Sequence, residues 1–139
     1  MKIEIELTEN EYIKLLKISS YKKLSKEEYT ESIIKKDLES SIYLEYGYVY
    51  DLNKKALMYE NHLILFNNLE RQLFEYLIKN IDQYVSSEEI IDNVVKLKPM
   101  SIFAMRNQIK NIRDKTHKKL VISKSNIGYM IKKLIVSEC

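Results

Sequence analysis

The chain has 139 residues, of which 45% are apolar and 31% charged, a composition typical of one globular domain or of two very small ones. Only two Gly and one Pro occur, which disfavours long flexible linkers. The single cysteine, Cys139, excludes an internal disulfide, and with only His62 and His117 beside it a Cys/His metal cluster is excluded too.

Segments that would direct a protein into or across a membrane are not expected. The chain begins with charged and apolar residues in alternation, which is unlike a signal peptide. Its longest apolar runs, residues 63–66 and 134–136, are too short to span a bilayer. Together with the cysteine count, these features predict a cytoplasmic protein.

The small net charge of +3 conceals a basic segment at one end of the chain. Residues 1–41 hold 8 Lys/Arg and 9 Asp/Glu, and residues 42–95 hold 4 and 9. Residues 96–139 hold 11 and 2, a net charge of +9. Such asymmetry is typical of a face that binds phosphates. The alternative is a solvated basic surface, or one that pairs with the acidic middle.

The first 41 residues predict a strand followed by two helices. Apolar and charged residues alternate over residues 2–7, the pattern of a half-buried strand. Thr8 and Ser25 are each followed three residues later by Glu, which predicts two capped helix starts.

From residue 42 onward the order predicted is a sheet, three helices and a hairpin. Capping signals at Asn67, Ser86 and Ser101 predict the starts of the three helices. Short antiparallel strands are expected before them and two strands after them: about 43–51, 56–59, 62–66, 120–123 and 129–134.

The third of these helices, expected over residues 101–115, combines a core face with a basic face. Its apolar stripe consists of Ile102, Met105, Ile109 and Ile112. The residues left to face outward are Arg106, Asn107, Lys110, Asn111, Arg113 and Asp114. Arg bonds guanine bidentately, Asn bonds adenine, and Lys and Arg grip phosphates, so this face predicts contact with the DNA major groove. A merely solvated helix face is the alternative.

The predicted hairpin supplies a second basic element. Lys124, Ser125 and Asn126 form its turn, where they would lie against the DNA backbone or in the minor groove. Gly128 is expected to provide a positive φ or a close backbone approach.

Three stretches together are similar to the winged-helix effector domain of OmpR/PhoB-type bacterial response regulators, over residues 43–133. They are FNNLERQLFEYL at 66–77, YVSSEEIID at 84–92, and IKNIR at 109–113 followed by IGYMI at 127–131. The resemblance implies an α+β winged helix-turn-helix with an N-terminal antiparallel sheet, a three-helix core and a C-terminal β-hairpin wing. It also implies double-stranded DNA as ligand and RNA polymerase as a second candidate partner.

Residue by residue, the resemblance gives Arg106, Lys110, Asn111 and Arg113 recognition-helix positions. Ser123, Ser125 and Tyr129 receive wing positions. The whole predicted DNA-binding set is Arg106, Asn107, Lys110, Asn111, Arg113, Ser123, Lys124, Ser125, Asn126 and Tyr129. The family usually has Arg-Gly where this chain has Ser125-Asn126, which argues against an Arg inserted in the minor groove. Residues 1–41 are too few to form a receiver domain.

Residues 1–41 resemble the ribbon-helix-helix family of dimeric repressors. The resemblance implies a homodimer whose interface uses Ile3, Ile5, Leu7, Ile33 and Ile34. In that family outward strand residues enter the major groove, but here they include Glu4 and Glu6, which phosphates would repel. Another helical dimerisation or partner module, or true DNA contact, are the alternatives.

The sequence therefore predicts two domains, residues 1–41 for dimerisation and 42–139 for DNA binding, in a sequence-specific transcriptional regulator. The second hypothesis is a protein–protein interaction module on a winged-helix scaffold, which would not need the basic segment. An enzyme is least favoured, because His62 and His117 have no nucleophile or carboxylate constellation around them. No cofactor, no metal site and no catalytic residue is expected.

Overall fold

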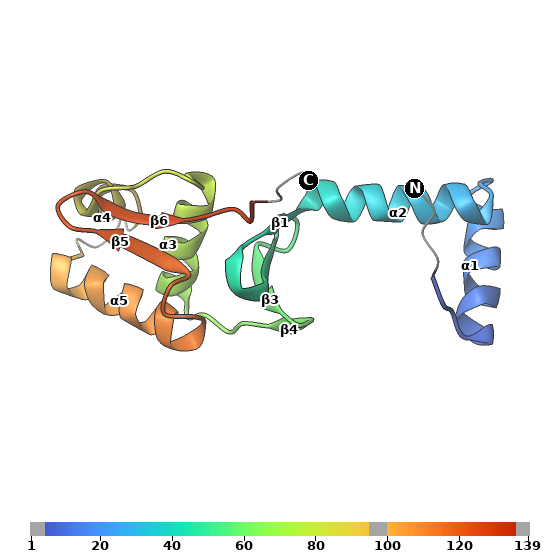
Figure 1. Cartoon of the computed structure of the whole chain (residues 1–139), viewed down its shortest axis with the longest axis horizontal. Helices are drawn as coiled ribbons and strands as arrows, with labels where there is room; N and C mark the ends of the chain where they lie inside the picture. The colour runs from blue at the N-terminus through green and yellow to red at the C-terminus, as the bar shows by residue number, and fades with distance from the viewer. Residues whose placement is uncertain (1–4, 95–99, 136–139) are drawn as a thin grey trace. The chain divides into compact units, whose positions relative to one another are not determined.

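The computed structural model describes residues 5–94 and 100–135 (Figure 1). The chain divides into two compact units, with the boundary between Ser40 and Ser41. In the part of the chain that is described, no helix is long and apolar enough to cross a membrane.

The first unit contains two helices, α1 (Glu9–Tyr21) and α2 (Lys26–Ser40). The predicted capping box at the start of α1 is confirmed: the Glu11 amide donates to Thr8 Oγ1 at 3.2 Å and the Thr8 amide donates to Glu11 Oε1 at 3.1 Å. The Ser25 hydroxyl likewise accepts a hydrogen bond from the Glu28 amide, at 3.1 Å.

The strand predicted over residues 2–7 is not present where the chain is described. Residues 5–8 lie outside any helix or strand, and residues 2–4, with Ile3 among them, fall outside the described range. A strand needs a hydrogen-bonding neighbour, and no described strand pairs with residues 5–7. Alternation predicts which residues share a face, but it does not supply the partner strand.

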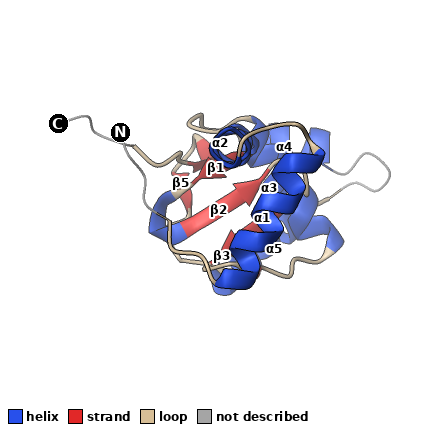
Figure 2. Ribbon diagram, turned by 90° about the vertical axis from the view of Figure 1, so that its right-hand side faces the viewer, coloured by secondary structure: helices blue, strands red, loops and turns tan. Residues whose placement is uncertain are grey.

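The second unit follows the predicted order of sheet, three helices and hairpin (Figures 1 and 2). Its first, antiparallel sheet has the strand order β1 (Ser41–Tyr43), β2 (Tyr48–Asp51), β3 (Ala56–Tyr59), β4 (His62–Leu63). Then come α3 (Asn68–Lys79), α4 (Ser87–Val94), α5 (Ile102–Lys115), β5 (Val121–Lys124) and β6 (Gly128–Ile131). The predicted α+β winged-helix architecture is confirmed.

The single strand predicted over residues 43–51 is wrong, because the chain reverses within it. A 3-10 turn, η1 (Glu45–Gly47), separates β1 from β2. Tyr46 and Gly47 have φ of 62° and 83°, left-handed conformations that turn the chain back on itself. As a result Tyr43 pairs with Val49 across two antiparallel strands.

The last predicted strand, residues 129–134, also ends early. β6 stops at Ile131, and the chain then joins the first sheet, where Leu44 and Lys133 form an antiparallel bridge. The Leu134 amide donates to the Tyr43 carbonyl at 2.8 Å. β5 and β6 form a two-stranded sheet of their own, and this bridge and hydrogen bond link the chain that follows β6 to the first sheet.

The first sheet, the three helices and the hairpin all contribute side chains to the core of the second unit. α3 contributes Leu73, Phe74 and Leu77, and the Asn67–Glu70 capping box fixes where that helix begins. Other fully buried side chains are Leu44 and Leu57 from the sheet, Ile90 from α4, Met105, Ile109 and Ile112 from α5, and Val121 and Ile131 from the hairpin. These residues form one apolar cluster that orients α5.

One buried polar group in this core gives a prediction about pH. The Tyr50 hydroxyl is buried and forms no hydrogen bond with a described residue. Burial, helped by the Glu75 carboxylate, raises the pKa of Tyr50 to about 12. Because the folded protein favours the neutral phenol, stability is expected to be retained below pH 10 and lost progressively between pH 10 and about 12.

Replacing Tyr50 with Phe is therefore expected to change the free energy of unfolding at pH 8 by less than about 1 kcal/mol, since an unsatisfied hydroxyl is removed. At pH 11 the variant should be the more stable protein. Urea unfolding of both proteins at the two pH values measures this. A parallel loss of stability in both would show that Tyr50 does not cause the alkaline dependence.

Candidate nucleic-acid interface

Helix α5 has one face in the core and one in solvent. The Ser101 hydroxyl caps it by accepting a hydrogen bond from the Ala104 amide at 3.1 Å, as predicted. Met105, Ile109 and Ile112 are buried and Ile102 is half-buried, so the predicted apolar stripe is confirmed. The stripe packs into the core cluster with residues of α3 and α4, which fixes the rotation of the helix about its axis.

The opposite face of α5 is basic and unoccupied. Arg106, Asn107 and Lys110 are exposed, at helical spacings of three and four, and Asn111 is half-buried. Within residues 5–94 and 100–135, no side-chain hydrogen bond or ion pair joins Arg106, Asn107 or Lys110 to another residue. These three side chains are free to bind a ligand.

Arg113 does not face outward as predicted. Its guanidinium is half-buried, and its Nε and Nη2 atoms donate to the Val121 carbonyl at 3.0 and 2.7 Å. The physical reason is that the first strand of the hairpin has a carbonyl within reach of the last turn of α5. Arg113 thereby joins α5 to β5, and only its remaining N–H donors are left for a ligand.

A second link holds the same end of α5. Lys115 Nζ lies 2.6 Å from Oε2 of Glu70, whose side chain is only 1% exposed. Glu70 also accepts hydrogen bonds from the Asn67 amide at 3.0 Å and from Asn67 Nδ2 at 2.9 Å. Sequence patterns did not predict this pair, because its partners are 45 residues apart. Lys115 is therefore an anchoring residue rather than a free cation.

The turn of the hairpin presents polar side chains to solvent. Ser123, Lys124, Ser125 and Asn126 are all exposed, as the prediction required. Lys124 Nζ lies 6.0 Å from the centroid of the Tyr84 ring, a weak cation–π contact that restrains it. Figure 1 shows α5 in orange and the hairpin in red, with the turn at its free end.

Tyr129 and Gly128 fix the second strand of the hairpin. Tyr129 is half-buried, and its backbone exchanges hydrogen bonds of 2.8 and 2.9 Å with Val85. Gly128 has φ 145°, and a Cβ at this position would lie 1.9 Å from the Val85 carbonyl oxygen. The predicted need for glycine at residue 128 is confirmed, for both reasons expected.

Between the end of α5 and β5 the surface forms a basic hollow of about 450 Å³. The residues that line it are Tyr46, Arg113, Lys118, Lys119, Val121, Ile122 and Ser123. The Tyr46 ring stacks on His117 with centroids 3.9 Å apart and planes 8° from parallel. His117 Nδ1 accepts a hydrogen bond from the Lys119 amide at 3.0 Å, so the loop that carries the two lysines is ordered. This arrangement suits an anion such as a backbone phosphate.

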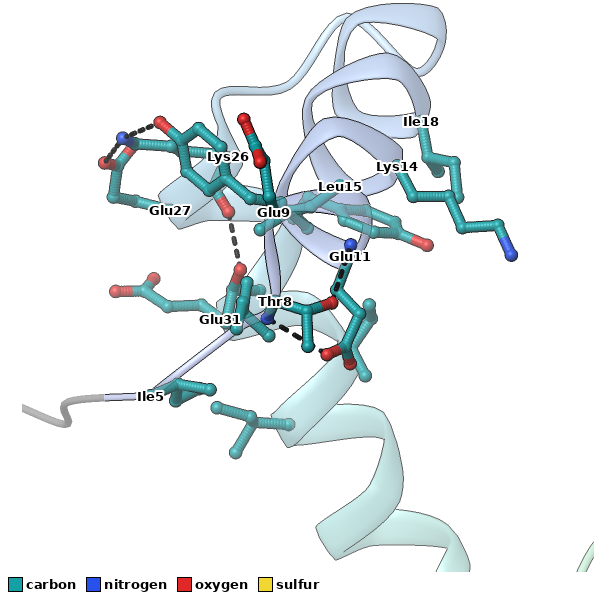
Figure 3. A pocket seen from close by; sticks show the side chains of 16 residues that line it. Ile5, Thr8, Glu9, Glu11, Lys14, Leu15, Ile18, Lys26, Glu27 and Glu31 are labelled. Atoms are coloured by element: carbon teal, nitrogen blue, oxygen red, sulfur yellow. Dashed lines mark hydrogen bonds and ion pairs between the residues drawn. The ribbon is translucent and has the colours of Figure 1, made fainter.

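The predicted dimerisation residues lie in the first unit, where apolar side chains remain uncovered. Ile5 is 53% exposed, Ile33 47% exposed, Leu7 is exposed and Ile34 half-buried. Ser19 is the sole buried residue among those described in this unit. A groove of about 1230 Å³ runs beside α1 and α2. Apolar side chains such as Leu15 and Ile18 line it together with charged ones such as Glu11 and Lys14 (Figure 3).

Among the residues that the structure describes, no group of three or more His, Cys, Asp or Glu side chains lies close enough together to hold an ion. A three-helix core with an exposed basic helix and a β-hairpin defines the winged-helix class.

The comparisons with known proteins identify the type of winged helix. No protein-family model matches the sequence, and no curated protein matches it. The response regulator DrrB of Thermotoga maritima, an OmpR/PhoB homologue, is 18% identical with a TM-score of 0.57, over 76% of this chain and 52% of DrrB. The DNA-binding domain of CpxR from E. coli is 18% identical with a TM-score of 0.55, over 66% of this chain and 95% of that domain.

A third structure is the Klebsiella pneumoniae RstA DNA-binding domain in complex with the RstA box. It is 12% identical with a TM-score of 0.55, over 66% of this chain and 96% of that domain. The second unit therefore has the winged-helix fold of the OmpR/PhoB-type DNA-binding domains, as predicted. The chain spans about half of the length of DrrB.

Proposed function

We propose that the second unit binds double-stranded DNA sequence-specifically and that the protein regulates transcription. α5 inserts in the major groove, and the hairpin contacts the backbone or the minor groove beside it. The observation that carries the proposal is the exposed face of α5, where Arg106, Asn107 and Lys110 are held outward by a buried apolar stripe. These are side chains that read base edges and grip phosphates.

Electrostatics support the same placement. The chain from residue 96 onward carries a net charge of +9, while residues 42–95 carry −5. Lys118 and Lys119 line the hollow at the end of α5, and Lys124 lies at the turn of the hairpin. Positive groups thus lie along α5, in the loop that follows it and at the turn of the hairpin, where they could contact phosphates of one duplex. The RstA domain, which shares the fold, is solved in complex with the RstA box.

Fluorescence anisotropy with labelled duplex DNA tests this function directly. The full chain is titrated with a genomic fragment pool at several salt concentrations. The chain is expected to bind. The logarithm of its association constant should fall linearly with the logarithm of the salt concentration, with a slope of about −0.9 for each phosphate contacted. An absence of binding at low salt would overturn the proposal, and a protein-interaction module on a winged-helix scaffold would then replace it.

The first unit is proposed to join two copies of the chain. It leaves Ile5, Leu7 and Ile33 exposed in the groove beside α1 and α2, and the two helices bury too little to hold together alone. A second copy offers the same groove and the same unpaired segment before α1, so a two-fold arrangement covers both. Winged helices joined in this way would occupy two half-sites on one duplex.

Analytical ultracentrifugation tests the dimer. The double variant Ile5→Asp/Ile33→Asp replaces two apolar side chains of the groove with carboxylates and is expected to be monomeric at concentrations where the natural chain is dimeric. The variant Asn10→Asp/Ser32→Asp is the matched control, since it adds the same negative charge at exposed positions outside the groove. A natural chain that stays monomeric at every concentration would contradict the proposal.

Binding to DNA further implies that the protein acts in the cytoplasm. RNA polymerase, the second candidate partner, stays a prediction from the resemblance.

A further inference from the structure

An aromatic residue at the start of α5 has no role in the function described so far. Phe103 is 76% exposed, on the first turn of the helix. Single exposed apolar side chains are common on protein surfaces, so exposure alone does not indicate a function. The position of this ring on the helix does suggest one.

Phe103 belongs to the same face as the free basic residues. It precedes Arg106 by three residues, Asn107 by four and Lys110 by seven, spacings that place all four side chains along one side of a helix. In helix-turn-helix proteins the N-terminal residues of the inserted helix are the ones that contact base edges. Phe103 therefore occupies the end of the face that would lie deepest in the groove.

The chemistry of the major groove limits what a phenyl ring can contact there. Base edges present donors and acceptors, and the C5-methyl group of thymine is the apolar feature among them. Asn107, one turn further along, has the side chain that bonds adenine N6 and N7. Both residues thus favour A·T pairs. Because they are one helical turn apart, they would contact neighbouring base pairs of the duplex.

We propose that Phe103 is a specificity-determining residue that packs on a thymine methyl group and, with Asn107, selects A·T pairs facing the start of α5. The inference rests on the proposed DNA-binding function and adds the base composition of one part of its target. Phosphates do not supply this preference, because Arg106 and Lys110 would bind any duplex electrostatically.

The test replaces single methyl groups on the DNA. A high-affinity duplex is first selected from a random pool with the natural chain. Each thymine is then replaced by deoxyuridine, which removes only the C5-methyl group. The natural chain is expected to lose about four-fold in affinity at one or two thymines, the effect of about one buried methyl group.

The Phe103→Ala variant supplies the second half of a double-mutant cycle. It should bind the unmodified duplex about 10-fold more weakly, and it should no longer distinguish thymine from deoxyuridine at the sensitive position. Phe103→Leu, which keeps an apolar contact, should regain part of both effects. Leu65→Ala is the matched control, because Leu65 is 75% exposed and lies in the same unit but outside α5.

The results for Phe103→Ala and for the deoxyuridine duplexes decide whether Phe103 contacts a thymine methyl group. Undiminished binding by Phe103→Ala, or a response to deoxyuridine that persists in it, would overturn the role of Phe103 while leaving the DNA-binding function intact. If the natural chain selects no duplex at all, the proposed function fails and this inference fails with it. Thermal unfolding of the variants verifies that the substitutions leave the fold unchanged, which is expected because alanine favours a helix.

Discussion

The double variant Arg106→Glu/Lys110→Glu is expected to bind duplex DNA about 1,000-fold more weakly than the natural chain, because two contacts of about 1–3 kcal/mol each are lost and two repulsions are gained. Both side chains are exposed on α5, so the fold should be unaffected. The salt dependence should also become shallower by about one unit of slope for each phosphate contact removed. Fluorescence anisotropy at three or more salt concentrations measures both quantities.

A matched control separates this effect from a change in net charge. Lys54→Glu/Lys55→Glu alters the charge by the same amount, in the turn between β2 and β3. Lys55 pairs with Glu75 at 3.5 Å, but an exposed ion pair of this kind contributes only about 0–1 kcal/mol. The control should lose little affinity. Equal losses in both double variants would show that α5 is not the DNA-binding face.

Gly128→Ala is expected to destabilise the second unit by about 3 kcal/mol or more, a large effect for a single methyl group. The new Cβ would lie 1.9 Å from the Val85 carbonyl oxygen and 2.5 Å from the Val85 carbonyl carbon. Neither backbone is free to withdraw, because Val85 and Tyr129 exchange two hydrogen bonds. The φ of 145° is itself unfavourable for alanine.

Gly47→Ala provides the comparison for this prediction. Gly47 also has a positive φ, of 83°, but its added Cβ would meet only the edge of the Tyr59 ring, at 3.3 Å. Its cost should be limited to the left-handed backbone, about 1–2 kcal/mol. Urea unfolding followed by circular dichroism ranks the two variants. A Gly128→Ala protein as stable as Gly47→Ala would refute the close approach of the hairpin to Val85.

Features set by neighbours in the sequence were predicted well. The Asn67–Glu70 box and the Ser101 cap involve residues three apart, and the stripe from Ile102 to Ile112 is a property of one helix. Local hydrogen bonds and helical periodicity determine these features, so a single sequence contains enough information.

Features that join distant segments were missed. The sequence suggested that Arg113 is free, because it lacks any sign that the Val121 carbonyl would lie within 3.0 Å. The Lys115–Glu70 pair depends on how α5 crosses α3, and the sequence does not encode that contact locally. The exposed Phe103 was missed although it lies outside the predicted apolar stripe, because only polar and charged side chains were assigned to the outward face of the helix.

Backbone conformations outside the ordinary regions were a third source of error. Tyr46 adopts φ 62°, a left-handed conformation that a bulky residue rarely takes, and the many Tyr, Val and Leu residues around it favoured an unbroken strand. Gly47 was the one available signal for a turn at that point. The strand predicted before α1 failed differently, because no described strand pairs with residues 5–7 and the alternation of apolar and charged residues does not supply a partner.

The hairpin is fastened to the helical core along both strands, by Arg113 to β5 and by Val85 to β6. In the proposed complex with DNA, such a hairpin would not move independently of α5, so the distance between the two proposed points of contact would be fixed by the protein. The duplex would have to adjust instead, by narrowing a groove or by bending, and the energy required would depend on the stiffness of its base steps. Flexible steps between the contacts would then be favoured even though no side chain touches them.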